Sequence, residues 1–222
     1  MFLRQILAII HKDITAELRT KEMFSSMFVF ALLAVIIFNF AFELRVVDAL
    51  TIAPGVLWVS VVFAGMLGLN RSFVLEKDRG CLDGLLLAPM DRSAIYFGKM
   101  AGNFIFITVV EAMILPIFAA LLNVNLIQPW ILGVLLLGTL GFSGVGTLFS
   151  AMAVHTRARE VLLPVLLFPV VVPILIAAVK LTAGFLDGQA LADMSNWMQL
   201  LVAFDIILIA VSYMTFDYVV EE

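Results

Sequence analysis

Residues 70–99, with the sequence NRSFVLEKDRGCLDGLLLAPMDRSAIYFGK, form the one richly polar segment of an otherwise apolar chain. They hold five of the 13 Lys and Arg residues, together with four carboxylates. Uncharged runs long enough to cross a bilayer lie on both sides, which predicts an aqueous loop between two transmembrane helices. The positive charge of the loop predicts that it lies in the cytoplasm.

A short amphipathic helix is predicted inside this loop. Leu82, Leu85 and Leu86 recur at helical spacing beside Asp83 and Gly84, so the helix would carry a ridge of leucine side chains. A leucine ridge in an aqueous loop is suited to binding, and we expect it to contact another protein.

The composition of the chain is that of an integral membrane protein. Hydrophobic residues make up 64% and charged residues 14%, with a mean hydropathy of +1.14, whereas about a quarter of the residues in soluble domains are charged. The single cysteine, Cys81, excludes an internal disulfide, a zinc cluster and a Cys-x-x-Cys-His haem attachment. Neither a nucleotide-binding loop nor a Ser-His-Asp set is visible, so we expect no catalytic residue, cofactor or metal site in this chain.

Uncharged runs predict an all-α fold with six transmembrane helices. A helix with apolar residues three or four apart is predicted before them, at residues 1–22, lying along the membrane surface. We expect one membrane domain over residues 1–222. The six spans are predicted at residues 23–42, 51–70, 96–122, 130–154, 161–182 and 196–218.

The distribution of positive charge predicts the orientation. Six spans place both termini on one side, and that side would hold four Lys and Arg residues before the first span, five in the 70–99 loop and two at residues 155–160. Of the 13 positive residues, 11 therefore fall on the side that carries the termini, which predicts that both termini are cytoplasmic.

Two carboxylates, Glu111 and Asp205, lie well inside predicted spans, away from the span ends. An ionised carboxylate in hydrocarbon is costly unless it is paired or hydrated, so such residues are candidates for function. The alternative is that each is protonated or hydrogen-bonded between helices and serves packing. The sequence leaves both interpretations open.

The fourth and fifth spans carry residues that affect helix packing and shape. Pro164, Pro169 and Pro173 each remove a backbone hydrogen bond from the fifth span, which predicts a kinked helix. The kink either bends during a transport cycle or is static, and both alternatives stay open. Small residues between Gly133 and Ser150 predict close helix packing in the fourth span, with a homodimer as one candidate partner.

Several segments resemble known exporters. HKDITAELRTKEMF at residues 11–24, EKDRG at 76–80, LLLAPMDRSAIYFGKM at 85–100 and the six-span plan resemble permeases of the ABC-2 type. More narrowly, the run from Ala53 to Lys99, LLFPVVVPILIAA at 166–178 and the ending FDYVVEE resemble the haem exporter protein B family. The resemblance covers essentially the whole chain.

This resemblance implies a role as the permease subunit of the ABC transporter of cytochrome c maturation in the bacterial inner membrane. In such transporters the loop between spans two and three carries a coupling helix that docks on a separate ATPase subunit. The expected ATPase-coupling interface is therefore Glu76, Asp78, Arg79, Gly80, Leu82, Asp83, Leu85 and Leu86.

The resemblance also implies partners. These are the ATPase, which binds ATP and Mg²⁺, a haem-handling membrane subunit, a small accessory subunit and a haem chaperone. We also expect this chain to form a homodimer and to contact membrane lipid, and we expect it to bind no nucleic acid. ATP hydrolysis would drive either haem export or release of the haem-loaded chaperone. The absence of histidine on the predicted outer side or within a span favours release. Alternatives are an ABC-2 exporter of a lipid, glycan or drug, and a membrane scaffold that needs no ATPase.

Overall fold

A computed structural model describes residues 2–43, 49–78, 84, 91–154, 156 and 158–221. Within these residues the chain is helical, and no strand occurs. The helices are α1 (Phe2–Thr20), α2 (Glu22–Glu43), α3 (Ala49–Asp78), α5 (Arg92–Leu122), α6 (Pro129–Ala153), α7 (Arg159–Leu186) and α8 (Ser195–Glu221).

Six of these helices, α2, α3, α5, α6, α7 and α8, are long and apolar enough to cross a membrane. They confirm the predicted all-α fold with six spans, and most of their ends fall within a few residues of the predicted ones. The main difference is α3, which continues to Asp78 although its span was predicted to end at residue 70. No Gly or Pro occurs between Leu69 and Asp78, so charge alone does not end the helix.

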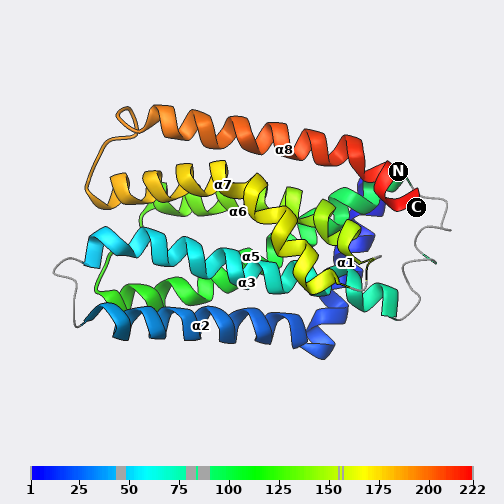
Figure 1. The fold of residues 1–222 in the computed structure, drawn as a ribbon, viewed down its shortest axis with the longest axis horizontal. Coiled ribbons are helices and arrows are strands. Elements are labelled where there is room, and N and C mark those ends of the chain that lie inside the picture. The colour runs from blue at the N-terminus through cyan, green and yellow to red at the C-terminus, as the bar shows by residue number, and fades with distance from the viewer. Residues whose placement is uncertain are drawn as a thin grey trace.

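The helix α1 lies across one end of the bundle, and both chain termini lie at that same end (Figure 1). Its exposed face carries Leu3, Leu7 and Leu18, as expected for a helix on a membrane surface. Between α1 and α2, Lys21 adopts a left-handed conformation with φ 56°. Glu17 then accepts a hydrogen bond from the Phe24 backbone N–H at 2.8 Å, which satisfies a free donor in the first turn of α2.

The helix α6 is central, because it packs against α3, α5, α7 and α8. Its glycines make this possible: a Cβ at Gly138 would overlap the ring of Trp58, and one at Gly146 would overlap Leu69, both on α3. The small residues of α6 predict close helix packing correctly, and the packing partners are helices of the same chain.

In Figure 1 the helices α8 and α2 run along opposite edges of the bundle. The helix α7 lies beside α8 and contains all three predicted prolines, Pro164, Pro169 and Pro173. It is one continuous helix whose ribbon changes direction along its length (Figure 1).

Candidate functional site

The helix α1 rests directly on α5 because α5 has glycine at two positions one turn apart. Ile9 lies so close to Gly98 that an added Cβ would be 2.8 Å from the Cβ of Ile9. One turn further on, Asp13 lies beside Gly102, where a Cβ would be 3.6 Å from the carboxylate. The matched i, i+4 spacing on both helices brings charged side chains of α1 down to the level of α3 and α5.

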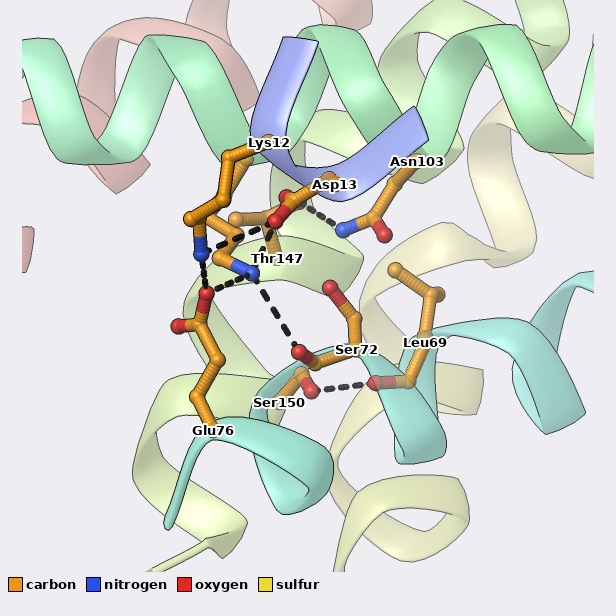
Figure 2. Close-up of polar contacts among 9 residues, drawn as sticks. Lys12, Asp13, Leu69, Ser72, Glu76, Asn103, Thr147 and Ser150 are labelled. Atoms are coloured by element: carbon orange, nitrogen blue, oxygen red, sulfur yellow. Dashed lines mark hydrogen bonds and ion pairs between the residues drawn. The ribbon is translucent and has the colours of Figure 1, made fainter. Parts of the chain in front are cut away.

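Four charged side chains from three helices meet at this contact: Lys12 and Asp13 of α1, Glu76 of α3 and Lys99 of α5. We call them the four-charge cluster. Lys99 Nζ lies 3.0 Å from Asp13 Oδ2 and 2.8 Å from Glu76 Oε1. Lys12 Nζ lies 3.0 Å from Asp13 Oδ1 and also contacts the Glu76 carboxylate. Figure 2 shows Lys12 and Asp13 reaching from α1 toward Glu76.

Because two members of the four-charge cluster are buried, their charges must be compensated by partners inside the protein. The side chain of Lys99 is 2% exposed and that of Glu76 is 9% exposed, so each of these two charges depends on the other members of the cluster for compensation. Two positive and two negative groups balance one another, which is the arrangement that a buried charge needs. Lys99 also donates to the Ser72 carbonyl at 3.3 Å and lies 5.3 Å from the centre of the Phe73 ring.

A second set of polar contacts lies next to the cluster and joins α5, α6 and α3 (Figure 2). Asn103 Nδ2 donates to Thr147 Oγ1 at 2.9 Å, and Ser150 Oγ donates to the Leu69 carbonyl. At the end of α3, Lys77 Nζ donates to the Val154 carbonyl at 2.8 Å. The last turns of α3 are thus bonded to α1, α5 and the end of α6.

A cavity of about 220 Å³ adjoins the four-charge cluster. All four charged side chains line it, together with Glu17 of α1. Apolar side chains such as Met23 and Phe106 complete the wall, so the cavity has both polar and apolar lining residues.

The structure places part of the expected ATPase-coupling interface. Glu76 is buried and engaged within the chain, and Asp78 is the last residue of α3. The Glu76 carboxylate binds Lys12 and Lys99 within the chain, and its role in contact with an ATPase stays a prediction. Arg79, Gly80, Leu82, Asp83, Leu85 and Leu86 lie outside the described residues.

The two carboxylates of the spans have different surroundings. Glu111 of α5 is 6% exposed and accepts a hydrogen bond from Thr139 of α6. Asp205 of α8 is 3% exposed, and neither of its oxygens has a hydrogen-bond partner among the described residues. It lies against Gly141 of α6, where a Cβ would overlap its carboxylate. Glu111 thus has a hydrogen-bond partner on a neighbouring helix, whereas the Asp205 carboxyl group has none among the described residues.

Sequence reasoning missed Lys12, Asp13 and Lys99 as members of a site. One signal was available: Lys99 falls inside the predicted span 96–122, where a charge requires an opposite charge at the same depth. Among the described residues, no group of three or more His, Cys, Asp or Glu side chains is arranged to hold a metal ion.

Comparison with known proteins identifies the family. A family profile described as "CcmB protein" matches residues 4–221. Proteins named "Heme exporter protein B" are similar to this chain in sequence. The one from Rhodobacter capsulatus is 30% identical over 185 residues, which cover 83% of this chain and 85% of the relative. The one from Paracoccus denitrificans is 35% identical over 126 residues, covering 56% of this chain and 58% of the relative.

A third relative of the same name, from Pseudomonas aeruginosa, is 27% identical over 154 residues and covers 69% of each chain. The profile match begins in α1 and ends at the last residue of α8, so it includes every helix described above. A match of this extent, joined to a six-span apolar fold, assigns the chain to the CcmB protein family.

Proposed function

We propose that this chain is the membrane permease subunit of an ABC transporter complex for cytochrome c biogenesis in the bacterial inner membrane. The observation that carries the proposal is the family match over residues 4–221, with relatives named "Heme exporter protein B" along most of the chain. The six helices able to span a membrane support a permease role.

The chain itself hydrolyses no ATP and binds no cofactor; a separate subunit binds ATP and Mg²⁺, and the complex handles haem. The ATPase docks on the segment between α3 and α5, whose leucine ridge supplies the apolar contacts. This segment connects to helices at the α1 end of the bundle, where both chain termini also lie (Figure 1). That end faces the cytoplasm because 11 of the 13 Lys and Arg residues belong to it.

The four-charge cluster transmits displacements of the segment between α3 and α5 to helices of the bundle. Asp78 ends α3 just before the docking segment, and Glu76 lies two residues earlier. A displacement of the docking segment therefore acts on Glu76, and through Lys12 and Lys99 on α1 and α5. The four-charge cluster keeps α1, α3 and α5 together during this displacement, since separating a buried charge from its partner has a high free-energy cost.

The output of this coupling is haem export or release of a haem-loaded periplasmic chaperone. Release is the better supported of the two, because the sequence predicts neither of its two histidines within a span or on the outer side, where one could bind haem iron. The partners in this task are a haem-handling membrane subunit, a small accessory subunit and the chaperone.

Deletion of the gene tests the cellular task. We expect c-type cytochromes to disappear while b-type cytochromes persist, because only c-type haem must be attached covalently to cysteine thiols. Staining for covalent haem should show a chaperone that holds haem but stays on the complex if release is the output. A chaperone without haem would indicate export. Normal levels of c-type cytochromes, in a strain without a second copy, would contradict the proposal.

Substitution of the leucine ridge tests ATPase docking. Leu85→Asp would bury a charge in the interface and should weaken binding by roughly 2 kcal/mol or more. The ATPase should then be lost on purification, although the permease still inserts. Leu85→Met is the matched control, because it keeps an apolar side chain of similar volume. Retention of an active ATPase by both Leu85→Asp and Leu86→Asp would show that the ridge is not the docking site.

A further inference from the structure

The cavity of about 220 Å³ beside the four-charge cluster has an uneven balance of charge. Its lining holds three carboxylates but only two ammonium groups: Asp13, Glu17, Glu76, Lys12 and Lys99. Both lysines contact Asp13 and Glu76. Glu17 takes part in no ion pair among the described residues. The cavity therefore has one carboxylate that lacks a cation.

Glu17 is 7% exposed, and only one of its two oxygens is engaged. Its Oε1 accepts the hydrogen bond from the Phe24 backbone N–H, and the positive end of the α2 dipole favours a negative charge at this place. The second oxygen, Oε2, accepts no hydrogen bond from the described residues and keeps some accessible surface. Glu17 can therefore accept a hydrogen bond from a bound group.

Two hydroxyl groups line the same cavity. The Ser72 side chain is half-buried and forms no hydrogen bond with the described residues. Thr20 Oγ1 donates to the Ala16 carbonyl at 3.2 Å, which leaves its own lone pairs free to accept. Together with Glu17, these hydroxyls provide three acceptors, and a primary ammonium group has three N–H donors. A metal ion is a poorer match, because no group of three metal-binding side chains occurs among the described residues.

The position of the cavity and its apolar lining limit what can carry the ammonium group. Lys12 and Ala16 are exposed and lie one turn apart on α1, so the cavity reaches the surface along this helix. The helix α1 lies across the end of the bundle (Figure 1), and its exposed leucines suit the depth of lipid headgroups. Met23 and Phe106 offer apolar contacts to methylene groups next to the nitrogen.

We propose that this cavity binds a primary ammonium group on a short methylene chain, with Glu17 as its carboxylate partner. Two sources carry this chemistry: the ethanolamine headgroup of a membrane phospholipid, and a free alkylamine in the adjoining aqueous phase. The site does not depend on the leucine ridge, so the inference goes beyond the proposed ATPase coupling.

Lipid retention by the purified full-length protein tests the membrane source. The protein is reconstituted in bilayers with equal amounts of dioleoyl phosphatidylethanolamine and dioleoyl phosphatidylcholine, and the lipid that stays bound after extraction is identified by mass spectrometry. The two lipids differ only at the nitrogen, where choline has methyl groups in place of the N–H donors. We expect the ethanolamine lipid to be retained at least about tenfold more than the choline lipid, because choline leaves the acceptors of the cavity unpaired.

Thermal unfolding of the same protein in detergent tests the soluble source. Ethanolamine and choline are added at equal concentrations, and a ligand that binds the folded state raises the unfolding temperature. A rise with ethanolamine alone would identify a free amine as an occupant. Retention of the ethanolamine lipid without this rise would identify the lipid headgroup.

Substitutions in the cavity assign the preference for ethanolamine to this site. Glu17→Gln keeps an oxygen for the Phe24 N–H but removes the charge, so the preference should fall about tenfold. Glu22→Gln is the matched control, because Glu22 is 59% exposed at the start of α2 and does not line the cavity. It should leave the preference unchanged.

Ser72→Ala keeps the test open if Glu17→Gln fails to fold. It removes an acceptor that makes no hydrogen bond within the described part of the chain, and it should lower the preference several-fold. Equal responses to ethanolamine and choline in both measurements would overturn the proposal. The same preference in Glu17→Gln and Ser72→Ala as in the unaltered protein would overturn it as well.

Discussion

Lys99 is charged, almost wholly buried and placed inside a helix able to span a membrane, so its position depends on its two carboxylate partners. Removing one member of a buried ion pair leaves an uncompensated charge, whereas removing two opposite charges does not. The effect of a single substitution should therefore exceed that of a balanced double substitution.

We predict that Lys99→Met destabilises the folded protein by about 3–5 kcal/mol, because Asp13 and Glu76 would then share only Lys12. Adding Glu76→Gln should recover part of this loss, since the charges balance again. Thermal unfolding of the purified protein in detergent measures both variants.

The exposed ion pair between Arg71 and Glu22 is the matched control. Its atoms lie 2.9 Å apart, and the two side chains are 45% and 59% exposed. Arg71→Ala should cost no more than about 1 kcal/mol, because water solvates the remaining carboxylate. If Lys99→Met and Arg71→Ala lowered the free energy of unfolding equally, burial of the four-charge cluster would contribute nothing to stability.

At the scale of single helices, the prolines of α7 bear on movement. Pro169 lies on the exposed face of α7, so replacing it removes no core contact, and Pro173 is half-buried. Each proline leaves the carbonyl four residues earlier without its helical donor, which lowers the cost of bending. Bending during a transport cycle stays a prediction.

We predict that Pro169→Ala with Pro173→Ala stiffens α7 and slows ATP turnover coupled to transport, without loss of complex assembly. Pro116→Ala in α5 is the control, because this proline is also exposed and lies inside a spanning helix. Coupled ATPase activity in reconstituted complex measures the effect. Unchanged turnover in the α7 double variant would assign its prolines to static packing.

Helices of this chain were predictable, and the contacts between them were not. Length and apolarity are local properties, so the run from residue 23 to residue 42 is sufficient to predict α2. The pairing of Lys99 with Asp13 joins residues far apart in the chain and depends on Gly98 letting α1 approach. The helix α3 continues to Asp78, past the predicted end of its span at residue 70, and Glu76 in this extension contacts Lys99.

For the whole molecule, the main prediction is that both termini lie on the cytoplasmic side of the membrane. Cys81 is the one cysteine of the chain and belongs to the segment between α3 and α5. An impermeant thiol reagent added to intact cells should therefore leave Cys81 unmodified until the inner membrane is made permeable.

Ala190→Cys in a Cys81→Ser background provides the opposite case. Ala190 is exposed and lies between α7 and α8, at the other end of the spans, so the reagent should reach it in intact cells once it has crossed the outer membrane. Modification of Cys81 from outside, or protection of a cysteine at position 190, would show that the predicted orientation is wrong.

The central place of α6 also sets an order for biogenesis. A ribosome delivers α2, α3 and α5 to the membrane before α6, because synthesis proceeds from the N-terminus. Until α6 arrives, Trp58 lacks the glycine face on which it packs and Glu111 lacks the hydroxyl of Thr139. A nascent chain of three spans therefore holds a carboxyl in the membrane before the hydroxyl that donates to it in the folded protein has been delivered.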